Sequence, residues 1–283
     1  NQGFPVNFSC KGRHLMVEFQ RKDFYSYEDF LEIMRLLRAP GGCPWDREQT
    51  HSSIRRNFLE ETYEVLDAID HDDASGMCEE LGDVLMQVAF HAQIEAERGR
   101  FTMANVVDGV ARKLVYRHPH VFGDVQADTS QQVLANWDVL KRREKGQRST
   151  ADAVEAVPHT LPALWRAEKI QSKTAKAGFD WTSSLQALDK LEEEVRELRA
   201  ALEAGQAADA PHGIREELGD TLFMAAKIAQ MSGVDPEDAL HRACDKFDRR
   251  FRAVEEAADK PLPECGEAEL LALWNDAKSH DPS

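Results

Sequence analysis

Two acidic motifs occur in the same order in each half of this chain, and this internal repeat constrains the fold more than any other feature. In the first half EETYE (residues 60–64) is followed by EELGD (79–83), and in the second half EEVRE (193–197) is followed by EELGD (216–220). The first motif recurs after 133 positions and the second after 137. The difference falls between the motifs, where the composition is that of a loop and a fold tolerates a change of length. We interpret the repeat as the duplication of one structural unit.

Apolar residues around the motifs recur at spacings of three and four, which is the period of an α-helix. Such stripes lie in residues 58–69, 81–89, 106–115, 188–202 and 218–228. Alternating apolar and polar stretches, which would indicate strands, are short and rare. The sequence therefore predicts an all-α fold built from antiparallel helices.

The predicted helical patterns divide the chain into two domains. Residues 142–162 contain Gly146, Ser149, Thr150, Pro158 and Pro162, a composition typical of a linker. We predict an N-terminal domain over residues 21–145, a linker over 146–162 and a C-terminal domain over 163–283. Residues 1–20 are expected to be non-native or disordered, because the first fifteen residues show no clear pattern and Met16 resembles a natural start.

Composition excludes several classes of function. The formal net charge of -16 argues against direct binding to nucleic acid, although a bound divalent cation would let such a chain accept phosphorylated ligands. The five cysteines are an odd number and form no CxxC pair, which disfavours a disulfide framework or a structural zinc site and favours a cytoplasmic location. No apolar run is long enough to cross a membrane, and the given sequence does not open on a positively charged segment followed by an apolar one.

The acidic motifs have the spacing of a metal site. Glu61 and Glu64 are three residues apart and share one face of a helix, and so do Glu80 and Asp83. If the two helices form an antiparallel hairpin, the four carboxylates can converge, which is unfavourable unless a cation lies among them. Oxygen ligands of this kind suit Mg²⁺, with Mn²⁺ as a substitute. The second half repeats the arrangement with Glu194, Glu197, Glu217 and Asp220.

A solvated acidic helix face is the simpler alternative for any one of these motifs. Two observations favour the metal site over it. The motifs recur in order, and each lies beside apolar residues near the edge of the expected core. In addition, Gly82 and Gly219 interrupt helical patterns, where glycine costs about 1 kcal/mol relative to alanine. We therefore expect a helix or a ligand to approach each glycine closely.

The EExxE…ExxD pattern resembles the signature of the all-α nucleoside triphosphate pyrophosphohydrolases, which include the MazG family, the dimeric dUTPases and the phosphoribosyl-ATP pyrophosphatases. The flanking sequence is similar to the MazG family from about residue 25 onward. The resembling segments are GCPWD (42–46), RHPHVF (117–122), GFDW (178–181) and KFDRRF (246–251). The resemblance implies two tandem MazG-like helical bundles, completed by dimerisation to a homodimer.

The resemblance also implies an activity: Mg²⁺-dependent hydrolysis of nucleoside triphosphates, including ATP, to nucleoside monophosphates and pyrophosphate. Broad or non-standard NTP and dNTP substrates and a role in nucleotide-pool housekeeping would follow. Both carboxylate quartets would hold metal, while Glu193 or Glu60 would orient the attacking water. By family likeness, nucleotide and phosphate contacts fall on Lys190, Lys246, Arg249, Arg250 and Trp274, and in the first half on Lys113, Arg117 and Trp137. The second half is expected to be the main site, because Tyr116 stands in the first half where the second has Arg249.

Other functions stay open on the sequence alone. A non-catalytic or regulatory helical protein that retains a metal site would show the same motifs, and pyrophosphate release would distinguish it from an enzyme. His71-Asp72 and His280-Asp281 spell the dipeptide of another class of helical phosphohydrolases, but that class needs further ligands on other helices. His118 and His120 flank a proline, which favours a structural role over a metal pair.

Overall fold

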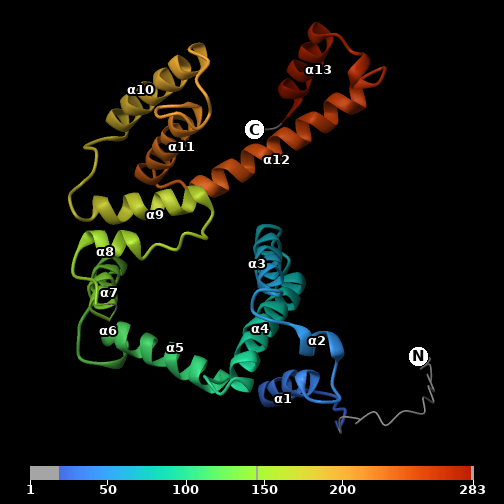
Figure 1. Cartoon of the computed structure of the whole chain (residues 1–283), viewed down its shortest axis with the longest axis vertical. Helices are drawn as coiled ribbons and strands as arrows, with labels where there is room; N and C mark the ends of the chain where they lie inside the picture. Colours follow the sequence, from blue (N-terminus) through green and yellow to red (C-terminus); the bar gives the residue numbers. More distant parts are fainter. Residues whose placement is uncertain (1–18, 145, 282–283) are drawn as a thin grey trace. The chain divides into compact units, whose positions relative to one another are not determined.

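The computed structural model describes residues 19–144 and 146–281, and every regular element in that part of the chain is helical (Figure 1). The predicted all-α class is therefore confirmed. Residues 1–18, most of the segment expected to be non-native or disordered, lie outside the described residues. Within the described part, no helix is both long enough and apolar enough to cross a membrane.

The chain forms two units, the first ending at Trp137 and the second beginning at Asp138. Helix α7 (Ser130–Glu144) runs through this boundary. The segment 146–162, predicted as a linker, contains the short helix α8 (Thr150–Glu155). Ala153 and Val157 of this segment are buried, because α8 packs against the helix that follows it.

An antiparallel helical hairpin forms the centre of the first unit. The helices of this unit are α1 (Tyr27–Arg38), α2 (Pro44–Glu48), α3 (Arg55–Asp70), α4 (Ala74–Glu97), α5 (Met103–Arg117) and α6 (Pro119–Phe122). Helices α3 and α4 form the hairpin, and α1 packs against α4. The core between them consists of Met34, Ile54, Ala89, Phe90 and Ile94.

The short turn of this hairpin has a local cause. Asp72 takes a left-handed conformation with φ 52°. Asp73 then caps α4, its side chain accepting hydrogen bonds from the backbone N–H groups of Ser75 and Gly76, both at 3.0 Å. An aspartate at this position satisfies donors that the first turn of a helix leaves free. The turn therefore reverses the chain within three residues and places α3 alongside α4.

The second unit repeats this hairpin. Its elements are α8, α9 (Ala163–Ala175), α10 (Ser184–Glu203), α11 (Ile214–Met231), α12 (Pro236–Ala257), the 3₁₀ turn η1 (Leu262–Glu264) and α13 (Glu267–His280). Helices α10 and α11 pair as α3 and α4 do, and α9 packs across α11. Figure 1 shows α13 folded back against α12.

Much of the predicted apolar pattern is exposed in the described chain. On α3 and α4 the exposed apolar residues are Leu59, Tyr63, Leu66, Ile69, Leu81 and Leu85. On α10 and α11 they are Leu188, Val195, Leu202, Leu218, Leu222 and Phe223. Each hairpin therefore carries apolar side chains that its own chain leaves in contact with solvent.

Candidate metal centre

Three carboxylates of the first half converge across the α3–α4 hairpin. One oxygen from each of Glu61 and Glu64, on α3, and of Glu80, on α4, lies within 4.8 Å of the other two. Asp83 is one turn beyond Glu80 on α4, and its charge acts on both Glu61 and Glu80. The hairpin thus gathers the first predicted quartet into one cluster.

The charges of this cluster repel each other. Burial raises the pKa of Glu61 above its ordinary value, and the nearby charges of Asp83 and Glu64 raise it further. Burial and the charge of Glu64 likewise raise the pKa of Glu80. A divalent cation among the oxygens would reverse this effect, because an opposite charge favours the ionised form of a carboxylate.

The second half repeats the cluster with deeper burial. Oxygens of Glu194, Glu217 and Asp220 lie within 4.8 Å of one another. Glu194 is only 7% exposed and Glu217 only 6%. The pKa of Glu197 is raised first by burial and then by the charge of Glu194, so the fourth carboxylate lies within electrostatic reach. Buried carboxylates normally require a partner, and a divalent cation would serve all of these oxygens at once.

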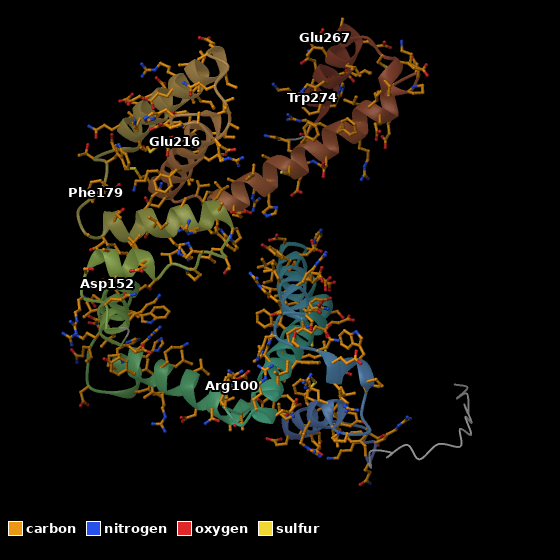
Figure 2. All side chains as sticks on the ribbon, viewed as in Figure 1. Arg100, Asp152, Phe179, Glu216, Glu267 and Trp274 are labelled. Carbon is orange, nitrogen blue, oxygen red and sulfur yellow. The ribbon has the colours of Figure 1, made fainter. Side chains whose placement is uncertain are left out.

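A cleft of about 590 Å³ opens over the second cluster. Its lining residues are Lys190, Glu194, Glu197, Ala200, Ala201, Ala204, Gln206, His212, Glu216, Glu217 and Asp220. Glu216, at the start of α11, is labelled in Figure 2. The cleft therefore contains all four predicted ligands of the second half and the predicted nucleotide contact Lys190.

Lys190 is the counter-ion of the motif. Its Nζ lies 2.7 Å from Oε1 of Glu193 and 2.9 Å from Oε1 of Glu194. Hydrogen bonds to these two carboxylates raise the pKa of Lys190, and the same contact lowers the pKa of Glu193. In the first half Glu60 pairs with the exposed Arg56 at 2.7 Å. Both residues expected to orient water thus pair with a basic side chain of their own helix.

The predicted phosphate-binding residues of α12 do not line the cleft. Arg249 and Arg250 both pair with Asp281, at 3.4 and 2.8 Å. The ring of Trp274, on α13, contacts Phe247 with centroids 5.3 Å apart (Figure 2). Arg249, Arg250 and Trp274 therefore lie where α12 meets α13, and Lys246 belongs to α12. Their contact with nucleotide stays a prediction.

The corresponding residues of the first half lie on other helices than the carboxylates of the first cluster. Lys113 and Arg117 belong to α5, and Arg117 is only 9% exposed. The ring of Trp137 contacts His118, with centroids 6.0 Å apart. In each half the tryptophan therefore contacts an aromatic ring that lies on the basic helix or directly after it. The predicted nucleotide contacts of the first half stay a prediction.

No helix of the described chain approaches the two motif glycines. A Cβ at Gly82 or Gly219 would meet no heavy atom within 4 Å. The expected close helix contact is therefore absent within the described chain. The glycines instead leave open backbone beside the acidic residues of α4 and α11.

The structure adds residues that the sequence did not single out. Gln87 is 6% exposed, and its Nε2 donates to Oε1 of Glu61 at 3.4 Å. It lies four residues after Asp83, a spacing that could have identified it. His212 lies 3.8 Å from Glu217, and its backbone N–H donates to Glu216 at 2.7 Å. His212 could not be identified in this way, because a single histidine in a loop has no helical spacing to the acidic residues.

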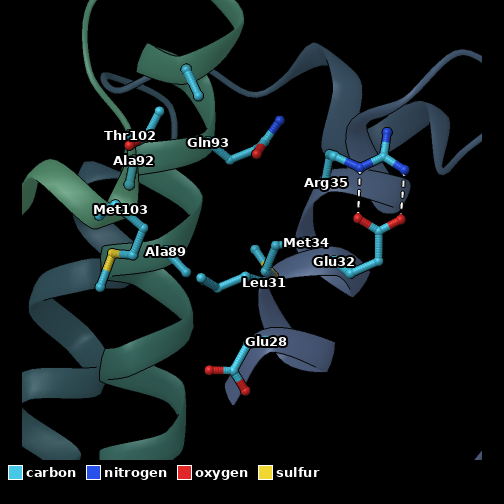
Figure 3. Close-up of a pocket in the computed structure, with 12 residues that line it drawn as sticks. Glu28, Leu31, Glu32, Met34, Arg35, Ala89, Ala92, Gln93, Thr102 and Met103 are labelled. Atoms are coloured by element: carbon cyan, nitrogen blue, oxygen red, sulfur yellow. Dashed lines mark hydrogen bonds and ion pairs between the residues drawn. The ribbon is translucent and has the colours of Figure 1, made fainter. Parts of the chain in front are cut away.

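Two other candidate features do not form a catalytic site. A cleft of about 380 Å³ between α1, α4 and the start of α5 is mostly apolar, and its Arg35 is paired with Glu32 at 2.6 Å (Figure 3). In the first HD dipeptide, His71 lies exposed at the end of α3. In the second, Asp281 forms ion pairs with Arg249 and Arg250.

The fold and the clusters define a class of protein: an all-α chain with a tandem pair of carboxylate-rich helical hairpins. The model of the MazG nucleotide pyrophosphohydrolase domain matches residues 49–122 and 182–254, one match over each hairpin. The chain is 46% identical over 226 residues to the nucleoside triphosphate pyrophosphohydrolase of Escherichia coli, covering 80% of this chain and 85% of that protein. It is 41% identical over 258 residues to the nucleoside triphosphate pyrophosphohydrolase/pyrophosphatase MazG of Thermotoga maritima, covering 90% of this chain and 96% of that protein.

The chain belongs to the MazG family of nucleotide pyrophosphohydrolases. The family resemblance seen in the sequence is thereby confirmed, and so is the prediction that the chain is an enzyme of this class.

Proposed function

We propose that this chain hydrolyses nucleoside triphosphates to nucleoside monophosphates and pyrophosphate with Mg²⁺ as cofactor. One observation carries the proposal: in both halves, three carboxylate oxygens from two helices lie within 4.8 Å of one another. The names of the relatives from E. coli and T. maritima support the same reaction.

The donor set fits magnesium. The clusters offer only carboxylate oxygens, which hard divalent cations prefer. The pKa of Asp220 is raised by burial and then by the negative charges of Glu194 and Glu216. In the second half Glu194, Glu197, Glu217 and Asp220 would hold the metal. When bound, Mg²⁺ would neutralise the triphosphate and lower the pKa of a water molecule. Mn²⁺ would substitute for it.

The residues of the chain supply the remaining chemistry. Lys190, at the edge of the cleft, would donate hydrogen bonds to phosphate oxygens and stabilise the charge that grows on them during hydrolysis. Glu193, whose pKa is lowered by the hydrogen bond from Lys190, stays ionised and would accept a hydrogen bond that orients the attacking water. Attack at the α-phosphorus would release pyrophosphate and leave the monophosphate.

We assign the main activity to the second half. Its buried carboxylates open to a cleft of about 590 Å³ that also contains Lys190. The substrates would be broad or non-standard NTPs and dNTPs, consistent with nucleotide-pool housekeeping. The net charge of -16 argues against direct binding to nucleic acid, and a bound divalent cation would let the site accept small phosphorylated ligands. The cytoplasmic location expected from the cysteines stays a prediction.

We also propose a homodimer. Exposed apolar residues on each hairpin, such as Leu59 at 55% and Leu222 at 49%, form faces that a second copy would cover. A second copy could likewise approach the open backbone at Gly219. Sedimentation velocity of the wild type should show a dimer, and Leu222→Glu should shift it toward monomer. A wild type that sediments as a monomer at micromolar concentration would refute this part of the proposal.

The activity is tested with a nucleotide panel in which pyrophosphate is measured with and without Mg²⁺. Pyrophosphate should form only with the cation, and Glu197→Gln should abolish most of the turnover. Glu64→Gln, the matched change in the first half, should reduce it less. If turnover persists in a variant with both changes, the carboxylate clusters are not the catalytic machinery.

A further inference from the structure

Glu61 and Glu194 occupy equivalent positions in the two repeats, yet their carboxylates interact with different kinds of side chain. Glu194 pairs with the ammonium of Lys190 at 2.9 Å, from the preceding turn of its own helix. Glu61 instead accepts a hydrogen bond at 3.4 Å from the neutral amide of Gln87, on the opposite helix of the hairpin. One cluster therefore contains a resident positive charge, and the other contains a neutral donor.

The difference is built into the sequence as an exchange at two positions. Asn57 stands in the first half where the second half has Lys190, at the 133-residue offset of the first motif. Met224 stands in the second half where the first has Gln87, at the 137-residue offset of the second motif. Met224 is 4% exposed, so it cannot replace the lost hydrogen bond.

The resident charge has a consequence for cation binding. Lys190 pairs with Oε1 of Glu194, and a positive charge this close repels a divalent cation. A cation that binds this oxygen must therefore displace the ammonium. The displaced ammonium stays beside the cleft, where the phosphates of a nucleotide would provide a new partner. The amide of Gln87 imposes no such competition on Glu61.

We infer that Lys190 is an exchangeable counter-ion, which competes with the metal for Glu194 until a triphosphate takes it over. Metal and nucleotide then bind to the second half cooperatively, whereas the first half binds a divalent cation tightly without nucleotide. This inference rests on the proposed function, since it assumes that both clusters bind metal.

The test measures Mn²⁺ binding to the full chain without nucleotide, with free Mn²⁺ followed by electron paramagnetic resonance. Glu64→Gln/Glu80→Gln disables the first cluster and isolates the second. In that background, Lys190→Met should tighten Mn²⁺ binding about tenfold, because the competing charge is removed. Lys190→Arg keeps the charge and should leave the affinity near that of the background.

The reciprocal change is made in the first half. Glu197→Gln/Glu217→Gln isolates the first cluster, and Asn57→Lys/Gln87→Met gives it the residues of the second. Its Mn²⁺ affinity should then fall about tenfold. Circular dichroism and thermal melting of each variant show whether the fold is retained, and a variant that does not fold is replaced by Asn57→Lys alone.

A second measurement uses an α,β-methylene nucleoside triphosphate at saturating Mn²⁺. Lys190→Met should weaken its binding to the isolated second half, although the same change tightens binding of Mn²⁺ alone. Unchanged or weaker Mn²⁺ affinity in Lys190→Met would overturn this inference and leave the proposed activity standing. If neither background binds Mn²⁺, the metal dependence of the proposed function itself fails.

Discussion

The ammonium of Lys227 lies 2.5 Å from Oδ1 of Asp180, and the lysine side chain is only 1% exposed. Lys227 belongs to α11, seven residues after Asp220 and so on the same helix face. Asp180 lies in the loop that enters α10 and also accepts the backbone N–H of Trp181 at 2.8 Å. The ion pair therefore fixes the start of the helix that carries Lys190 and Glu194.

Replacing Lys227 with methionine should destabilise the second unit. The change leaves Asp180 without its partner, and breaking a buried ion pair costs about 3 kcal/mol at the low end of the usual range. The low end applies because the side chain of Asp180 is 28% exposed. Urea denaturation measures the loss. The double variant Lys227→Met/Asp180→Asn should lose less than the sum of the single changes, and strict additivity would show that the pair does not interact.

Acid should weaken the first unit through His91. His51 and His91 stack with their Nδ1 atoms 2.7 Å apart, and burial, then the neighbouring His51, lowers the pKa of His91. The unfolded chain, with a histidine pKa of about 6.5, then binds more protons than the folded chain in weak acid. The free energy of unfolding should therefore fall as the pH drops below about 6.5.

Urea titrations between pH 5 and pH 8 measure this effect, and His91→Phe should flatten the profile. Glu95 faces His51 at 2.5 Å and also pairs with Arg98 and Arg100. The hydrogen bond from His51 is the main reason that the pKa of Glu95 is lowered, so this carboxylate stays ionised throughout the range. A wild type and a His91→Phe variant with the same pH profile would contradict the explanation.

Removing one charge from the second cluster should have opposite effects with and without metal. The raised pKa of Glu197 means that its ionised form opposes folding. In EDTA, Glu197→Gln should therefore melt at the wild-type temperature or above it. With Mg²⁺ the wild type should gain more stability than the variant, in which only the first cluster is intact, since a ligand stabilises the state that binds it. Glu192→Gln, an exposed change on the same helix, should keep the Mg²⁺ response, which differential scanning fluorimetry can measure.

The core and the exposed apolar face of the first unit should respond differently to truncation. Ile94 is 2% exposed, and Ile94→Ala should cost about 2–5 kcal/mol of unfolding free energy. Leu59 is 55% exposed, and Leu59→Ala should change the stability of the monomer by less than about 0.5 kcal/mol. Urea denaturation at low protein concentration compares the two. A large loss for Leu59 under these conditions would mean that its helix face is already covered.

The sequence predicted the helices and the carboxylate clusters because both depend on local spacing. Residues three apart share a helix face whatever surrounds them, so Glu61 and Glu64 could be paired without coordinates. Periodicity does not say which surface covers an apolar stripe, and the exposure of Leu59 and Leu222 could not be predicted.

Contacts distant in sequence were also beyond prediction. The family resemblance predicted that the basic residues of α12 bind phosphate. In the structure Arg249 and Arg250 pair with Asp281, which is more than thirty positions away in the sequence. The burial of Lys227 was also beyond prediction, because it depends on a loop that precedes α10. Such pairs depend on how the helices pack, which spacing within one helix does not encode.

Alanine substitutions at Gly82 and Gly219 could show whether another molecule covers the backbone of either hairpin. With no neighbour within 4 Å in the described chain, alanine at either glycine has room and should strengthen its helix by about 1 kcal/mol in an isolated subunit. An added methyl group would be harmful only where another molecule touches that backbone. A gain or a loss of stability on substitution of each glycine by alanine would thus show which acidic hairpin is covered in the assembled protein.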